Sequence, residues 1–185
     1  MTGSEYKNHD YYSITSLLTT EQKLVMTSTR KWVDKSVLPK IEEMCQSTVF
    51  DPEILKGLAG VGAFGPTIPT QYGGVGLDEM SYGLMMMELE RGDSGIRSAA
   101  SVQSSLVMFP IFQYGDEQQK QKYLPKLASG EYIGCFGLTE PDFGSNPSGM
   151  VTNFKDKGDH YLLNGAKMWI SNAPFAQIAV VWAKD

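Results

Sequence analysis

The pattern of the chain changes at Glu131-Tyr132-Ile133-Gly134-Cys135-Phe136. Upstream of this stretch, apolar residues recur at the three- and four-residue spacing of amphipathic helices. From this stretch onward, aromatic and β-branched residues fall in alternating runs, as they do in strands. We therefore predict an α+β chain, with an all-helical N-terminal domain over residues 1–130 followed by the first strands of a β domain over residues 131–185.

The helical part carries start and stop signals. Thr19 and Gln22 fit a capping box, and Asp51-Pro52 supplies an N-cap with a first-turn proline. We predict helices over residues 19–39, 51–60, 78–92, 96–114 and 116–130. The fourth should be disturbed at Pro110, because an internal proline removes a hydrogen bond and crowds the preceding turn.

In the second part, Asn164-Gly165 is the strongest short signal for a hairpin, because a two-residue turn needs positive φ angles. We predict that it joins a strand at residues 161–163 to a strand at residues 168–170. A further strand is predicted over residues 177–183.

Composition excludes several classes of function. The net charge is −5 and no run of Lys or Arg is present, so a nucleic-acid partner is not expected. No stretch approaches the roughly 18 apolar residues that span a bilayer, and the N-terminal residues lack the pattern of a signal peptide. Cys45 and Cys135 lie far apart without a metal-ligand spacing, so we expect no disulfide, no metal site and a cytoplasmic location.

Other features have ordinary structural interpretations. Residues 72–76, Tyr-Gly-Gly-Val-Gly, follow no strand, so we interpret them as a turn and not as a phosphate loop. Glu88 and Glu90 stand two apart on a helix, which favours a solvated face over an acid/base pair. His9 and His160 are isolated and are expected to be solvated. No catalytic residue is predicted.

Arg97 stands in a less ordinary stretch. It follows two glycines and enters a segment rich in small residues and hydroxyls, beginning with Ser98 and Ser101. An arginine that faces a cleft there could hold a carboxylate through paired hydrogen bonds. A surface arginine explains the pattern equally well.

Two short motifs point to a ligand with a planar ring. Leu138-Thr139-Glu140-Pro141 with Gly144-Ser145 forms a turn that exposes main-chain N–H groups and hydroxyls. Lys167-Met168-Trp169-Ile170-Ser171-Asn172 adds an aromatic face and a further hydroxyl. A simple transition from strand to loop explains the first motif alone, but both motifs together favour a binding site.

With these two motifs the chain resembles the acyl-CoA dehydrogenase family. Residues 88–91 and 97–108 are similar to the glutaryl-CoA dehydrogenase type in particular. The resemblance implies FAD and an acyl-CoA thioester. It implies flavin contacts from Phe136, Gly137, Leu138, Thr139, Gly144, Ser145, Trp169, Ile170 and Ser171. It also implies substrate contacts from Arg97 and Ser98 to a distal carboxylate, steadied by Glu90, and from Ser145 to the CoA ester.

The implied reaction is flavin-dependent oxidation of glutaryl-CoA with decarboxylation to crotonyl-CoA, and electron-transferring flavoprotein accepts the electrons. The resemblance also implies a homotetramer. Two departures are Ser171, where the family usually has Thr, and Asn146, where it usually has Asp. We expect this chain to be the N-terminal half, without the C-terminal helical bundle that holds the base. A general short-chain acyl-CoA dehydrogenase or oxidase and a non-catalytic acyl-CoA-binding module remain alternatives.

Overall fold

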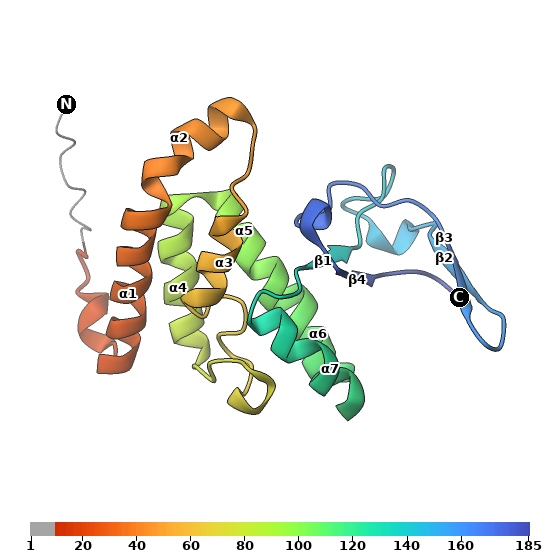
Figure 1. The fold of residues 1–185 in the computed structure, drawn as a ribbon, viewed down its shortest axis with the longest axis horizontal. Coiled ribbons are helices and arrows are strands. Elements are labelled where there is room, and N and C mark those ends of the chain that lie inside the picture. The colour runs from red at the N-terminus through yellow and green to blue at the C-terminus, as the bar shows by residue number, and fades with distance from the viewer. Residues whose placement is uncertain (1–9) are drawn as a thin grey trace.

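The computed structural model describes residues 10–185. The N-terminal residues tested for a signal peptide, and His9, lie outside this range. Helices make up the first part of the described chain and strands the last part, which confirms the predicted α+β order (Figure 1). The helical part contains η1 (Ile14–Leu17), α1 (Thr20–Ser36), α2 (Leu38–Ser47), α3 (Glu53–Gly60), η2 (Thr70–Tyr72), α4 (Glu79–Gly92), α5 (Ser94–Ser101), η3 (Val102–Met108), α6 (Phe109–Tyr114) and α7 (Glu117–Ala128).

Side-chain caps begin three of the predicted helices at the expected residues, whereas α3 has Pro52 and not Asp51 at its N-cap, and α5 begins two residues before the predicted start with Asp93 as its cap. The Gln22 amide N–H donates to Thr19 Oγ1 and the Thr19 N–H donates back to Gln22 Oε1, at 3.2 and 3.0 Å. Asp116 and Gln119 form the same capping box at the start of α7, and Asp78 accepts from Ser81 N at the start of α4. Each cap satisfies a backbone donor that the first helical turn leaves free.

One helix was not predicted. Pro39 was expected to mark the end of the first helix, but it lies in the first turn of α2, where proline needs no hydrogen-bond donor. The chain therefore breaks at Val37 and continues as a second helix to Ser47, most of it over residues for which no helix was predicted.

The fourth predicted helix contains a π-helical segment. Residues 94–114 form a continuous helical run, but η3 (Val102–Met108) has π-helical geometry, and the Phe109 N–H donates to Ser104 O five residues back. Pro110 follows this segment directly, in the first turn of α6. The predicted disturbance thus lies just before the proline, as a wider turn.

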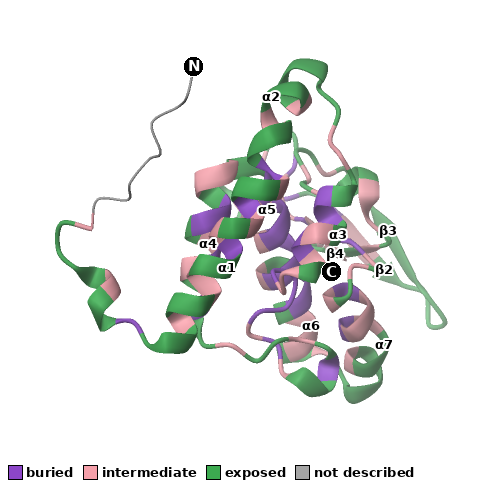
Figure 2. Ribbon diagram, turned by 60° about the vertical axis from the view of Figure 1, so that its left-hand side comes forward, coloured by how far each residue is buried: buried purple, intermediate pink, exposed green. Residues whose placement is uncertain are grey.

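The core lies among the helices. Val33 of α1 and Leu89 of α4 are fully buried, as are Leu58, Phe64 and Leu124. Figure 2 shows the buried residues gathered where α1, α3, α4 and α5 face one another, whereas the β2–β3 hairpin is exposed. No helix of the described residues is long and apolar enough to cross a membrane.

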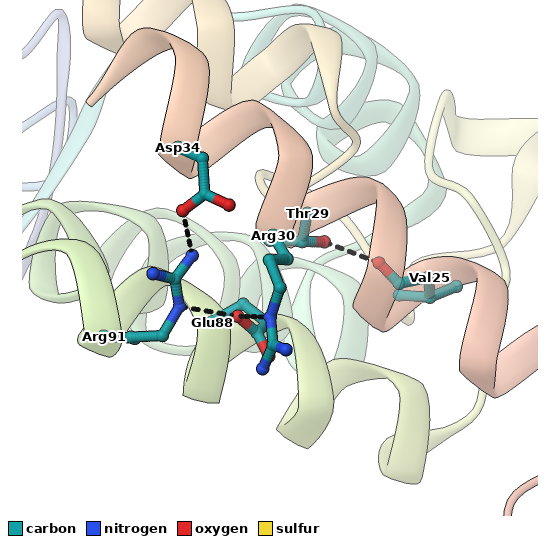
Figure 3. Close-up of polar contacts among 6 residues, drawn as sticks. All are labelled: Val25, Thr29, Arg30, Asp34, Glu88 and Arg91. Carbon is teal, nitrogen blue, oxygen red and sulfur yellow. Dashed lines mark hydrogen bonds and ion pairs between the residues drawn. The ribbon is translucent and has the colours of Figure 1, made fainter. Parts of the chain in front are cut away.

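Glu88 belongs to this interior, which corrects the prediction of a solvated face. Its side chain is 1% exposed. Arg30 donates to both carboxylate oxygens at 3.0 and 2.6 Å, and Arg91 Nε donates to Oε2 at 3.0 Å. Arg91 also reaches Asp34 on α1, so the network joins α1 to α4 (Figure 3). The spacing of residues along α4 could not show that α1 places Arg30 opposite Glu88.

The strands are β1 (Gly134–Gly137), β2 (Asn153–Asp156), β3 (Tyr161–Asn164) and β4 (Ile178–Val181). β1 pairs in parallel with β4, with Gly134 opposite Ile178, and β2 pairs antiparallel with β3. The strand predicted over residues 177–183 is confirmed as β4. β1 packs on η3 so closely that a Cβ on Gly134 would lie 2.5 Å from Val107.

The predicted hairpin is wrong. The turn joins β2 to β3 at residues 157–160, where Gly158 has φ 93° and its N–H donates to Asp156 Oδ1. Residues 168–170 are not a strand. Gly165 serves a different purpose, because a Cβ there would lie 2.3 Å from Thr152 Oγ1. The glycine permits a close backbone approach and does not form a two-residue turn.

Three smaller predictions agree with the structure. Tyr72 ends η2, and the turn follows at residues 73–76, with positive φ at Gly73 and Gly76. His160 is exposed. Cys45 and Cys135 are both free thiols.

Candidate functional site

The two motifs meet at a buried carboxylate. Glu140 follows β1 and is 2% exposed. Its oxygens accept from the amides of Val151 and Thr152 at 2.7 and 3.0 Å and from Lys167 Nζ at 2.8 Å. Lys167 Nζ also donates to Leu138 O at 3.0 Å. The first motif, the second motif and the entry to β2 are thus joined at one point.

The charge of Glu140 is fixed by these contacts. Burial favours the neutral carboxyl and would raise the pKa. The hydrogen bonds from Lys167 and from the amides of Val151 and Thr152 favour the carboxylate and prevail, so the pKa falls from the usual 4.5 to about 2. Glu140 is therefore an anion at neutral pH, and its low pKa makes it a weak base.

One main-chain hydrogen bond sets the spacing between the motifs. The Met168 N–H donates to Thr139 O at 2.9 Å. Thr139 and Trp169 therefore lie near each other although thirty positions separate them in the sequence, as the two motifs together suggested. Phe136 lies on β1, where its ring contacts Trp182 edge-on with centroids 6.2 Å apart.

Trp169 has an unusual conformation. Its φ is 59°, in the left-handed region that a bulky residue rarely adopts, and it is 86% exposed. The hydroxyls of Thr139, Ser145 and Ser171 make no hydrogen bond to other residues of the described range 10–185. An indole held outward at a conformational cost, beside unpaired hydroxyls, fits a planar ligand with polar edges.

Asn172 and Gln103 attach this region to the helices, and sequence reasoning assigned neither a role. Asn172 Nδ2 donates to Ala99 O of α5 at 3.1 Å and to Gly134 O of β1 at 3.2 Å. Gln103, fully buried in η3, donates to the carbonyls of Leu127 and Tyr132 and accepts from the Gly134 N–H. Gln103 is a polar residue at a core position of an apolar helix face, and this pattern could have indicated a buried hydrogen-bonding role.

Arg97 lies on α5 with charged and hydroxyl partners. Its Nε donates to Glu90 Oε2 at 2.6 Å and its Nη1 donates to Ser101 Oγ at 3.3 Å. Ser94 also donates to Glu90, and these hydrogen bonds, first that from Arg97, lower the pKa of Glu90. The Arg97 side chain is 36% exposed. It is thus positioned but still accessible.

A pocket of about 450 Å³ lies on the other face of α5. Ile96 and Ala99 contribute to its largely apolar wall, and Ser171 lines it as well. Arg97 and Ser98 do not, because they project from a different side of the helix. The pocket therefore brings Ser171 next to α5 but does not unite the residues predicted for the flavin with those predicted for a carboxylate.

Comparison with known families agrees with the two motifs. The family model described as "Acyl-CoA dehydrogenase, N-terminal domain" matches residues 19–131. The model described as "Acyl-CoA dehydrogenase, middle domain" matches residues 135–185. The chain belongs to the acyl-CoA dehydrogenase family. Both motifs, Leu138 to Pro141 and Lys167 to Asn172, lie within the residues that the middle-domain model matches.

Among acyl-CoA dehydrogenases, the chain is 41% identical over 169 residues to mitochondrial isovaleryl-CoA dehydrogenase of Bos taurus, covering 90% of this chain and 40% of the relative. It is 37% identical over 169 residues to glutaryl-CoA dehydrogenase of Desulfococcus multivorans, covering 90% and 43%. A crystal structure of a glutaryl-CoA dehydrogenase from Mycobacterium smegmatis in complex with FADH2 has a TM-score of 0.90 and 46% identity, covering 94% of this chain and 45% of that one. The chain thus spans less than half the length of these relatives.

Proposed function

We propose that this chain forms part of an FAD-dependent acyl-CoA dehydrogenase that oxidises glutaryl-CoA and decarboxylates the product to crotonyl-CoA. Within it, residues 1–130 form the N-terminal helical domain and residues 131–185 part of the middle β domain. The observation that carries the substrate assignment is the accessible guanidinium of Arg97, held by Glu90 and Ser101. No catalytic residue is assigned within the chain.

FAD is the proposed cofactor. Bound FAD supplies the acceptor for the hydride that leaves the acyl chain. The residues proposed to hold it are Phe136, Gly137, Leu138, Thr139, Gly144, Ser145, Trp169, Ile170 and Ser171. The free hydroxyls at Thr139 and Ser171 and the outward indole of Trp169 support this set. The Mycobacterium smegmatis relative, which was crystallised with FADH2, supports the cofactor.

Arg97 and Ser98 are proposed to bind the distal carboxylate of the acyl chain, and Ser145 the CoA ester. An arginine pre-aligned by a carboxylate and a hydroxyl loses little conformational freedom when a second carboxylate arrives. Glu90 therefore acts as a positioning residue. Its own carboxylate keeps the local charge balanced when no substrate is bound.

A general short-chain acyl-CoA dehydrogenase is the second candidate. The same Glu90–Arg97 pair supports it, because an arginine already neutralised by Glu90 needs no carboxylate from the substrate. The matches to both isovaleryl-CoA and glutaryl-CoA dehydrogenases fit either candidate.

The test is a ratio of specificities in the purified flavoprotein. In Arg97→Met, kcat/KM for glutaryl-CoA should fall roughly thirty- to nearly thousandfold, a loss of about 2–4 kcal/mol in transition-state stabilisation, whereas kcat/KM for butyryl-CoA should change little. Lys56→Met, which removes an exposed cation paired with Glu53, serves as the control and should leave the ratio unchanged. An unchanged ratio in Arg97→Met would favour the general short-chain enzyme.

The remaining parts of the proposal concern partners and location. Electron-transferring flavoprotein is the proposed electron acceptor, the complete enzyme is proposed to be a homotetramer, and the proposed location is cytoplasmic. A non-catalytic acyl-CoA-binding module would purify without flavin absorbance, so the visible spectrum of the protein separates this alternative from an enzyme.

A further inference from the structure

We propose that Glu140 and Lys167 act as a positioning pair that sets the distance between the two flavin-contacting segments. The inference rests on the proposed binding of FAD. The pair would control the affinity for FAD indirectly, by placing Thr139 and Trp169. Neither Glu140 nor Lys167 needs to touch the flavin ring.

The pair stands at the junction of the two segments. Glu140 follows Thr139 directly, and Lys167 precedes Trp169 by two positions. Lys167 Nζ bridges Glu140 Oε1 at 2.8 Å and Leu138 O at 3.0 Å, and the side chains are 1% and 12% exposed. Any movement of Lys167 relative to residues 138–140 therefore lengthens two charge-assisted hydrogen bonds.

Glu140 also binds a third segment, the residues that lead into β2. Its carboxylate also accepts from the amides of Val151 and Thr152, which lead into β2. The loop of residues 141–150, which carries Gly144 and Ser145, is therefore closed at its base by the same group. One carboxylate fixes both ends of this loop and the start of the second motif.

Stability alone is a weak reason for such a pair. Burying two charges costs solvation that their attraction does not always repay, so apolar residues of similar size can be equally stable. Apolar residues cannot fix the relative orientation of two irregular segments, because only hydrogen bonds depend on the angle between the groups they join. The contacts of Glu140 with three segments are therefore expected to set ligand geometry in addition to any effect on the free energy of unfolding, and the loss of stability in Glu140→Gln is matched by that in Glu88→Gln.

The chain offers two controls. Lys126 and Glu131 form an exposed pair of the same residue types, at 2.9 Å with 40% and 58% exposure. Glu88 is a buried carboxylate of the helical part, bonded to Arg30 and Arg91. The first controls for removal of the charges, and the second for a loss of stability unrelated to the flavin segments.

The experiment measures FAD affinity by quenching of flavin fluorescence and thermal midpoints by circular dichroism, in the purified protein. Glu140→Gln and Lys167→Met should each weaken FAD binding roughly tenfold to hundredfold, because small displacements of positioning groups have effects of that size. Glu131→Gln should change neither quantity. Glu88→Gln should lower the midpoint while FAD affinity, measured well below that midpoint, stays within about twofold of wild type.

A conservative variant separates geometry from charge. Lys167→Arg can still donate to both the carboxylate and Leu138 O, so it should recover a large part of the affinity lost in Lys167→Met. Hydrogen exchange at the amides of Val151, Thr152 and Met168 should accelerate in Glu140→Gln without FAD present.

Each outcome decides between the claims. If wild-type protein does not bind FAD, both the proposed function and this inference fail. If wild-type protein binds FAD and Glu140→Gln binds it equally well, the inference alone is overturned. The inference is also overturned if the FAD affinity of Glu140→Gln falls only as far as its lower thermal midpoint explains. In that case Glu88→Gln, with its own lower midpoint, would lose FAD affinity as well.

Discussion

Replacing Glu88 with Gln tests the ion network between α1 and α4. The substitution keeps the size of the side chain but removes the charge that receives hydrogen bonds from Arg30 and Arg91. Breaking a buried ion pair typically costs about 3–5 kcal/mol. The two guanidinium groups are 32% and 26% exposed and can be partly rehydrated, so we expect the lower end, about 3 kcal/mol.

For a chain of this length, each kcal/mol lowers the thermal midpoint by roughly 2–4 °C, so the expected loss is about 6–12 °C. The assay is thermal unfolding followed by circular dichroism at neutral pH. Glu90→Gln on the same helix is the matched control, because Glu90 is exposed, and its partners are a surface pair with Arg97 and a hydrogen bond from Ser94. Equal midpoints for the two variants would refute the view that the buried network holds α1 against α4.

Three further predictions concern the candidate site. Trp169→Ala should leave the thermal midpoint unchanged, because the side chain is 86% exposed, but should weaken FAD binding by about 1 kcal/mol beyond the lost contact area, measured by flavin fluorescence. Gln103→Leu leaves the Gly134 N–H and the Tyr132 carbonyl unpaired, at about 1–3 kcal/mol for each group, so the midpoint should fall and exchange at Gly134 should accelerate. Finally, the pKa of Glu140 is lowered from 4.5 to about 2, so its stabilisation is complete above about pH 5 and is lost as pH falls from 4.5 to 2. Urea unfolding of wild type and Glu140→Gln should therefore converge towards pH 2, and a constant difference would contradict this.

Local signals predicted the helix starts well. Thr19, Asp78 and Asp116 each cap a helix through a bond to a residue three positions later, and this information is contained within four neighbouring residues. The change from helices to strands near residue 131 was also visible in the alternation of residue types. Where local chemistry decides the structure, the sequence was sufficient.

Long-range contacts account for the wrong predictions. Asn164-Gly165 has the composition of a tight turn, but Gly165 is required for its approach to Thr152, which no local pattern reveals. Glu88 looked solvated because its partner Arg30 lies 58 positions away. In both cases a tertiary contact, and not the local pattern of the sequence, decided the structure.

The proximity of the two motifs was predicted, and the structure brings the two segments together through the Met168–Thr139 hydrogen bond. The roles of Thr139, Trp169 and Ser171 in binding flavin stay a prediction. The sequence did not reveal that Glu140 and Lys167 join them, because an ion pair between two loops follows neither helical nor strand spacing.

The π-helical segment has a consequence for how related sequences vary. Deleting one residue within Val102–Met108 would let its hydrogen bonds shorten to the α-helical pattern while α5 and α6 keep their orientation. In an ordinary α-helix, the same deletion turns every later side chain by about 100°. Single-residue length differences among homologues should therefore concentrate in this turn. Alignments that forbid gaps inside helices will assign Arg97 or the residues after Pro110 to the wrong counterparts.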